Sequence, residues 1–285
     1  NWPAMKVVLS ALDPWTLRTV CLMAGGGAVL AIAALAGQRL RLRGDAGRLL
    51  VAAALNVTGW HMLTAFALTQ MAAGRAAIVG FTMPIWAAPL AWRLLGERFD
   101  RRRLIALALG AAALGLLLAP DLAEFGRRPL GTALMAGAAL SWAGGTIATK
   151  RWSGLWGLDA AALTGWQLLL GGLPVVAGML LWGRPAALAE LGPTPAAALL
   201  YIVALPMVYC HWAWFRLVAA FPANLAAMAT LGVPVVGVLG SALLIGEWPT
   251  AFDLGALALV LAALSLVRPA GAARAADPAT DRPAA

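Results

Sequence analysis

The sequence predicts an all-α membrane protein of ten transmembrane helices, the first of them clipped, arranged as two inverted five-helix repeats. Three observations predict this fold. Hydrophobic residues make up 62% of the 285 residues and charged residues 12%, which leaves too much apolar surface for a water-soluble domain. Apolar runs of spanning length alternate with short connections. One stretch of the chain also returns 150 residues later.

The apolar runs predict nine full spans, because each is about as long as the 17 to 25 residues that a helix needs to cross a bilayer. They are centred in residues 16–37, 49–69, 76–95, 104–119, 130–149, 161–182, 196–215, 224–245 and 251–267. Residues 1–11 are about half a span and are interpreted as a clipped helix. The tail 268–285 has no apolar periodicity, so we expect it to be disordered and cytoplasmic.

The internal repeat relates residues 80–97 to residues 230–247. The same offset pairs the only two histidines of the chain, His61 with His211, and the prolines Pro84 with Pro234. Each unit holds an odd number of spans, so the second unit must enter the membrane from the opposite side. The sequence therefore predicts a first repeat over 1–119 and a second, inverted repeat over 120–267.

The net charge of +9 comes from cations placed between the apolar runs, which is typical of topology signals and not of a nucleic-acid surface. One set of connections carries fifteen lysines and arginines. The opposite set carries five, which are Arg18, Arg75, Arg127, Arg128 and Arg184. The excess predicts that both termini lie in the cytoplasm.

The chain resembles the EamA-like, ten-helix branch of the drug/metabolite transporter superfamily, and within it the YddG-type exporters of aromatic amino acids. The residues that carry the resemblance are Asn1, Lys6, Trp142, Lys150, and Pro84 to Gly96-Glu97 with its echo Pro234 to Gly246-Glu247. It implies a multi-pass transporter of small metabolites in the bacterial inner membrane, with a central cavity between the halves. Gly145 departs from the pattern, because the repeat would pair it with Asn1.

Candidate substrate-binding residues gather around His61 and His211, which lie near the middle of their spans. Aromatic rings with a few hydrogen-bonding groups suit a pocket for an apolar or aromatic zwitterion. The candidates are His61, Trp60, Asn56, Thr64, Trp86, Tyr209, His211, Trp212, Trp214, Lys6 and Trp142. The alternative for the tryptophans is helix packing, and for Lys6 it is a side chain that reaches out to the interface.

A stripe of small residues leads to Pro84 in one repeat and to Pro234 in the other. Each proline removes one helical hydrogen bond, so each predicts a bend. The two prolines are candidate hinges for alternating access, and a fixed kink is the alternative reading.

The function predicted is export of small amphipathic metabolites, such as aromatic or other neutral amino acids, by alternating access. Every aspartate and glutamate lies in a loop, in the tail or at a span end, and the chain has no catalytic or phosphate-loop motif. We therefore expect no enzyme activity, no metal, no cofactor and no nucleic-acid partner, and a monomer in the lipid bilayer. A carrier of organic cations, purines or phosphorylated compounds remains the alternative, followed by a channel or an intramembrane enzyme.

Overall fold

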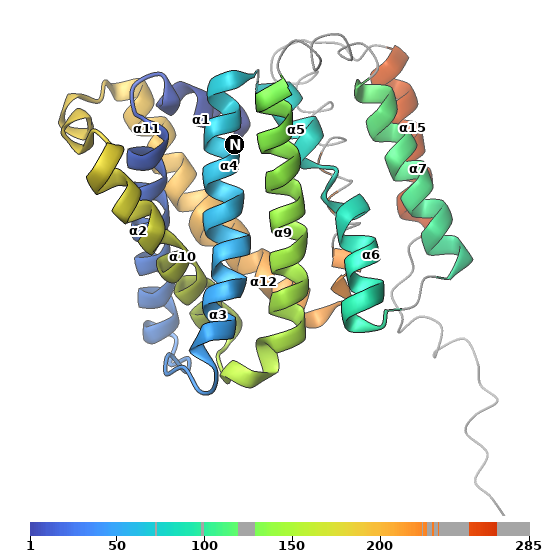
Figure 1. The fold of residues 1–285 in the computed structure, drawn as a ribbon, viewed down its shortest axis with the longest axis horizontal. Helices are drawn as coiled ribbons and strands as arrows, with labels where there is room; N and C mark the ends of the chain where they lie inside the picture. Colours follow the sequence, from blue (N-terminus) through green and yellow to red (C-terminus); the bar gives the residue numbers. More distant parts are fainter. Residues whose placement is uncertain are drawn as a thin grey trace, which may run out of the picture.

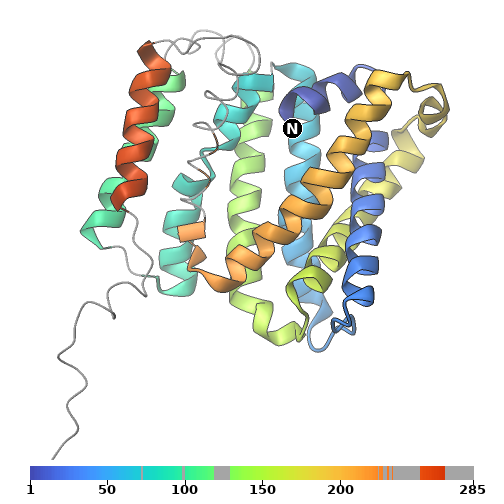
Figure 2. The same cartoon turned by 180° about the vertical axis from the view of Figure 1, so that it is seen from behind.

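The computed structural model describes residues 1–71, 73–97, 100–118, 129–223, 225–226, 230, 233 and 251–266, and every regular element within these residues is a helix. The helices stand roughly side by side, with α7 and α15 together at one end of the molecule and α2 and α11 at the other (Figures 1 and 2). Their bounds are α1 Trp2–Leu9, α2 Pro14–Leu35, α3 Ala46–Ala53, η1 Ala54–Gly59, α4 Trp60–Gln70, α5 Ala73–Gly80, α6 Met83–Leu95, α7 Arg101–Leu118, α9 Pro129–Trp156, α10 Ala160–Trp182, η3 Pro185–Glu190, α11 Pro193–Ile202, η4 Val203–Cys210, α12 His211–Ala220 and α15 Ala251–Leu266.

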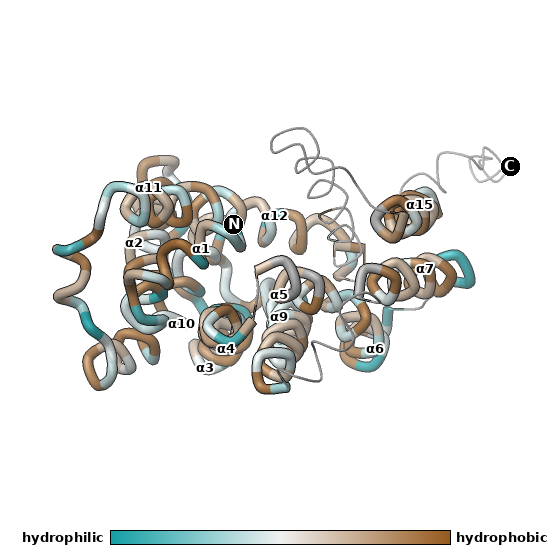
Figure 3. The backbone as a smooth tube through the Cα atoms, turned by 90° about the horizontal axis from the view of Figure 1, so that it is seen from above, coloured by the Kyte–Doolittle hydropathy of each residue, from teal (hydrophilic) through white to brown (hydrophobic). Residues whose placement is uncertain are grey.

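Within the described residues, five helical segments are long and apolar enough to cross a membrane. They are Pro14–Leu35, Ala46–Gln70, Pro129–Trp156, Ala160–Trp182 and Pro193–Ala220. Large apolar side chains are exposed on their outer surface, for example Leu35, Leu180 and Leu200, each at least 70% exposed. Apolar residues also run along α7 and α15 (Figure 3). Such a surface is stable against lipid and not against water, which confirms the prediction of an all-helical, multi-pass membrane protein.

Two of the long segments change to π-helix in the middle. The first, η1, joins α3 to α4, and the second, η4, joins α11 to α12. Pro206 lies inside η4, where its missing N–H removes one regular helical hydrogen bond. Each π segment ends just before a histidine of the predicted site. Helix α4 begins at Trp60, the residue before His61, and α12 begins at His211.

Helices α2 and α10 pack against each other in opposite directions along much of their length. Asp13, which precedes α2, accepts a hydrogen bond of 2.9 Å from the backbone N–H of Arg184, just beyond the end of α10. In the reciprocal contact Asp159, which precedes α10, accepts a bond of 3.2 Å from the backbone N–H of Arg39, beyond the end of α2. Each helix therefore begins where its partner ends.

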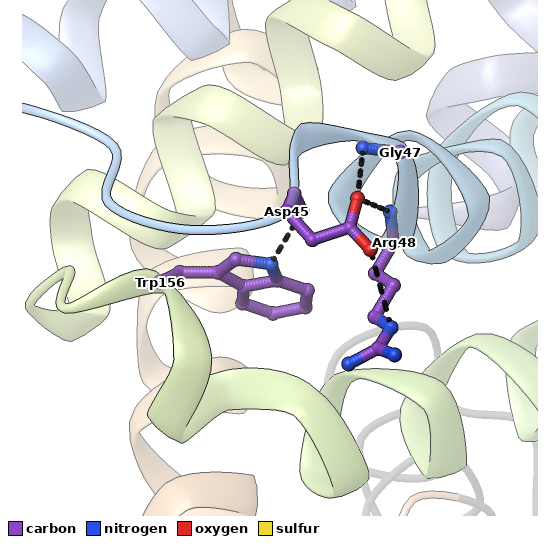
Figure 4. Close-up of polar contacts among 4 residues, drawn as sticks. All are labelled: Asp45, Gly47, Arg48 and Trp156. Atoms are coloured by element: carbon purple, nitrogen blue, oxygen red, sulfur yellow. Dashed lines mark hydrogen bonds and ion pairs between the residues drawn. The ribbon is translucent and has the colours of Figure 1, made fainter.

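The turn into α3 is held against the end of α9 (Figure 4). The Asp45 side chain accepts hydrogen bonds from the backbone N–H groups of Gly47 and Arg48, at 2.8 and 3.3 Å, as an N-cap does. The backbone carbonyl of Asp45 accepts a hydrogen bond from the indole N–H of the buried Trp156. Gly44 precedes this turn with φ 87°, and a β-carbon there would lie 2.5 Å from the carbonyl oxygen of Leu155. Glycine is therefore needed at residue 44.

The predicted span over 76–95 is not one bent helix. It is divided into α5 and α6 by a turn at Phe81 and Thr82, and Pro84 lies in the first turn of α6. Proline is accommodated there because the N–H groups of a first turn have no helical partner. The bend therefore precedes the proline, and its cause is the break at 81–82. Pro234, the other candidate hinge, lies outside the described residues, as do most of the predicted span 224–245 and the tail.

The end of α6 explains the Gly-Glu pair of the repeated stretch. Gly96 follows the last residue of α6 with φ 66°, the left-handed conformation in which glycine commonly terminates helices. The carboxylate of Glu97 then accepts a hydrogen bond of 2.9 Å from the backbone N–H of Ala223. Glu97 thus binds a free main-chain donor after α12.

We expect Asp13→Ala to lower the free energy of unfolding by about 1 kcal/mol, since an N-cap is lost. Burial raises the pKa of Asp13, but hydrogen bonds from Thr16 and Arg184 outweigh it and hold the pKa below its ordinary value of 3.8. Because the pKa in the folded state is lowered, this stabilisation is present above the unfolded pKa and is lost as pH falls through the folded pKa.

Thermal unfolding in detergent at neutral and acid pH measures this effect. Asp159→Ala is the matched control, because Asp159 accepts one bond from Arg39 and caps no N–H of its own helix. A destabilisation by Asp13→Ala that grows towards acid pH would contradict a stabilising Asp13 carboxylate with a lowered pKa.

Candidate functional site

The two repeat-related histidines meet inside the protein. His61 of α4 and His211 of α12 are 1% and 7% exposed, and their Nε2 atoms are 3.2 Å apart. The rings are stacked with their centroids 5.2 Å apart. This contact joins a residue of α4 to a residue of α12 that lies 150 positions later in the sequence.

The partners of the two rings fix which nitrogens carry hydrogen. Nδ1 of His211 lies 2.7 Å from the carbonyl oxygen of Pro206, and a carbonyl only accepts, so this nitrogen carries the hydrogen. In a neutral pair the Nε2 of His211 then accepts from the Nε2–H of His61. This leaves Nδ1 of His61 as a bare acceptor, buried without a hydrogen-bond partner among the described residues. A donor group or a proton could bind there.

Tryptophan rings surround the histidine pair. Trp142 of α9 meets His211 edge-on with centroids 5.8 Å apart, and lies 5.1 Å from Trp60 and 5.5 Å from Trp214. Within the described residues, the indole nitrogens of Trp142 and Trp214 are buried and have no hydrogen-bond partner. Buried polar atoms are nearly always paired in proteins, so three such atoms in one aromatic cluster make it a candidate binding site.

Arg18 is part of this site, although sequence analysis counted it among the loop cations. That placement is wrong, because Arg18 lies in the second turn of α2 and is 1% exposed. Its Nε donates a hydrogen bond of 3.0 Å to the carbonyl of His61, and its Nη2 donates one of 2.9 Å to Thr64 Oγ1. The Asp13-Pro14 start signal could have shown this, since it places residue 18 inside the helix.

A family model, the EamA-like transporter family, matches residues 1–119 and 129–268. The chain belongs to the EamA-like transporter family. It is 26% identical over 270 residues to the uncharacterized transporter YvbV of Bacillus subtilis, covering 94% of this chain and 86% of that protein. It is 28% identical to protein PecM of Dickeya dadantii, covering 81% and 77% of the two chains.

A third relative is the Probable amino-acid metabolite efflux pump of Salmonella typhimurium, which is 28% identical over 199 residues and covers 68% of this chain and 67% of that protein. One solved crystal structure has the same fold, with a TM-score of 0.75 at 18% identity, over 93% of this chain and 91% of the other. The family and the Bacillus and Salmonella relatives are transporters or efflux pumps and not enzymes, so this EamA-like protein is a membrane transporter of metabolites.

A second polar cluster of the EamA-like chain contains Asn56. Its Nδ2 donates to Thr149 Oγ1 at 2.9 Å and to Gln167 Oε1 at 3.1 Å, and Gln167 Nε2 donates to Thr149 Oγ1 at 3.1 Å. All three side chains are buried, and they join η1, α9 and α10. Asn56 therefore binds other helices and not the histidine pair. Sequence analysis missed Thr149 and Gln167, which lie as single polar residues in apolar runs.

The two lysines of the transporter cap helix ends. Lys6 Nζ donates to the carbonyls of Leu68 and Met71, at the end of α4. Lys150 Nζ donates to those of Val218, Ala219 and Phe221 at 2.8, 3.2 and 2.9 Å, at the end of α12. The pairs Leu68/Val218 and Met71/Phe221 are each 150 residues apart. Both ammonium groups satisfy carbonyls that have no helical partner.

Besides Asn56 and Lys6, three more of the predicted site residues lie outside the histidine cluster. Trp86 is 38% exposed and donates to Thr82 Oγ1. Tyr209 is 58% exposed and packs on Trp212, with ring centroids 6.0 Å apart. Trp212 also holds the Arg216 guanidinium 5.3 Å from its ring centroid. Among the described residues no group of three or more metal-ligating side chains occurs.

We expect Gly145→Ala to destabilise the transporter by about 1 to 3 kcal/mol, the usual cost of overpacking. A β-carbon at residue 145 would lie 2.5 Å from Asn56 Cγ and 2.6 Å from the Asn56 backbone nitrogen. This close approach of α9 to η1 also accounts for glycine at a position where the repeat would place asparagine.

Gly144→Ala is the matched control, because its β-carbon would meet Leu55 at an ordinary 3.7 Å. Thermal unfolding in detergent compares the two variants. Equal melting temperatures for both would show that α9 does not approach η1 as described.

Proposed function

We propose that the protein exports small amphipathic metabolites, in particular aromatic or other neutral amino acids, by alternating access around the cluster of His61, His211, Trp60, Trp142 and Trp214. The observation that carries this proposal is the set of three buried polar atoms without partners inside an aromatic cluster. Stacked rings suit the side chain of such a solute, and the free acceptor of His61 and the two indole N–H groups suit its polar groups.

The proposed architecture has ten spans in two inverted repeats, 1–119 and 120–267. Paired contacts support it. Asp13 and Asp159 bind the end of the opposite helix, Lys6 and Lys150 bind equivalent carbonyls, and a π segment precedes His61 and His211 at equivalent positions. The family model matches in two stretches, and an inverted pair of repeats places a shared site near the middle of the membrane.

The proposed solute class follows from the charges near the site. No aspartate or glutamate is buried among the residues whose side chains the structure describes, so the cluster offers no counter-ion from them for an organic cation. A solute with a carboxylate, or one that is neutral overall, fits better. The name of the Salmonella relative, which refers to an amino-acid metabolite, favours the same class.

The proposed motion uses the break between α5 and α6. Ala87 and Ala91 of α6 are buried against Ala143 and Ile147 of α9, a contact of small side chains that permits sliding. Pro84, next to the break, and Pro234 in the second repeat are the proposed hinges. We place the protein as a monomer in the bacterial inner membrane, with both termini in the cytoplasm.

Counterflow in proteoliposomes tests the function. Vesicles loaded with unlabelled L-phenylalanine are expected to take up labelled L-phenylalanine in a saturable manner. Trp142→Ala is expected to reduce the uptake about tenfold, because the loss of a ring contact of about 1.4 kcal/mol changes affinity by that factor. The control is Trp182→Ala, since Trp182 is 66% exposed and lies at the end of α10.

Uptake that no amino acid drives or competes for would contradict the substrate class. Ion conductance without saturation would contradict a carrier and indicate a channel. An equal loss in Trp142→Ala and Trp182→Ala would show that the cluster is not the site of binding.

A further inference from the structure

Arg18 is a buried cation with no counter-ion in the described part of the chain. It is 1% exposed, and no described carboxylate forms an ion pair with it, whereas Arg48 and Asp45 pair at the protein surface. A buried charge is costly unless it is paired and fully hydrogen-bonded. A guanidinium in this position is therefore incomplete without an anion.

The hydrogen bonds of Arg18 show which of its edges is free. The edge formed by Nε and Nη2 is occupied, because Nε donates to the carbonyl of His61 and Nη2 donates to Thr64 Oγ1. The terminal edge, formed by Nη1 and Nη2, has no oxygen partner. Nη2 meets the sulfur of Met5 at 2.9 Å, and Nη1 is buried without any partner among the described residues.

The terminal edge fits a carboxylate. Two parallel N–H groups of a guanidinium bind the two oxygens of a carboxylate in a planar, bidentate manner. A thioether is only a weak acceptor, and methionine is flexible, so Met5 of α1 could give way to the anion. Thr64 also donates to the carbonyl of His61, so the bonds of Thr64 and His61 hold the guanidinium in one orientation.

We propose that the terminal edge of Arg18 binds the carboxylate of the transported molecule, an inference that rests on the proposed function and names the substrate as a carboxylic acid anion. The guanidinium bonds to the residue that follows Trp60, so a carboxylate held there lies beside the aromatic cluster. The same arrangement gives the buried cation its missing partner during transport.

Competition in the counterflow assay tests the proposal on the unaltered protein. We expect 3-phenylpropionate and L-phenylalanine to inhibit uptake at least about tenfold better than L-phenylalaninamide, since a charge-assisted bond contributes that factor or more. If the amide competes as well as the acids, the Arg18 proposal is overturned while the transporter function stands.

Variants locate the effect. Arg18→Gln removes the charge and Arg18→Lys removes the bidentate edge, and both are expected to lose the preference for the acid over the amide. Arg216→Gln is the matched control, because Arg216 lies over Trp212 outside the cluster. Met5→Leu, a change of similar volume, keeps the guanidinium and is expected to keep or increase the preference. If Met5→Leu lost the preference for the acid over the amide, the terminal edge of Arg18 would not be where the carboxylate binds.

Thermal unfolding of the purified protein gives a reading that does not depend on transport. Propionate and benzoate are expected to raise the melting temperature of the unaltered protein and of Arg216→Gln, and to leave Arg18→Gln unchanged. If chloride stabilises and the carboxylates do not, the group is a chloride site and the proposal fails. If no anion stabilises the protein, the proposal also fails, even where counterflow shows that transport itself occurs.

Discussion

The hydrogen bond between His61 and His211 is the interaction around which the candidate site is built, because it joins the two halves of the chain in a buried place. Imidazoles at this depth need fixed partners, since lipid supplies none. The carbonyl of Pro206 fixes His211, and Arg18 holds the main chain of His61. The π segment around Pro206 matters for this reason, because the Pro206 carbonyl, which accepts a hydrogen bond from the backbone N–H of His211, also lies within hydrogen-bond distance of the ring.

The same requirement explains the polar residues away from the site. Lys6 and Lys150 bind the carbonyls at the ends of α4 and α12, and Asp13 and Asp159 bind the N–H groups beyond α10 and α2. Asn56 satisfies its N–H groups on α9 and α10. The lysines and aspartates fix the frame through main-chain partners and Asn56 does so through side chains, whereas the histidine cluster keeps three polar atoms without partners among the described residues. Single buried polar atoms of Thr19, Gln38, Asn56 and Thr146 also have no partner among the described residues, so what distinguishes the cluster is that three such atoms lie together among aromatic rings.

Composition and apolar runs predicted the helical membrane fold, and the offset of 150 residues paired His61 with His211 before any coordinates. The sequence was less successful in predicting which side of a helix each residue lies on. Trp212 and Trp214 are two residues apart and so lie on opposite sides of α12, Trp212 against residues of α2 and α10 and Trp214 in the cluster. A π segment also changes the face of the helix on which every later residue lies, and the regular spacing of apolar residues in the sequence does not reveal such a segment. Arg18 was missed because counting cations treats an arginine near a span end as a loop residue.

Access to the cluster from both membrane faces is the most direct test of the account. In a variant with Cys21 and Cys210 replaced by alanine, a single cysteine at position 214 would be labelled with a membrane-impermeant maleimide in right-side-out and in inverted vesicles. The account predicts labelling of Trp214→Cys from both sides, reduced in each case by L-phenylalanine at about tenfold the concentration that saturates the unaltered protein, since the variant lacks one ring of the cluster. Labelling from one side only, unchanged by any solute, would contradict a site that two halves of the protein expose in turn.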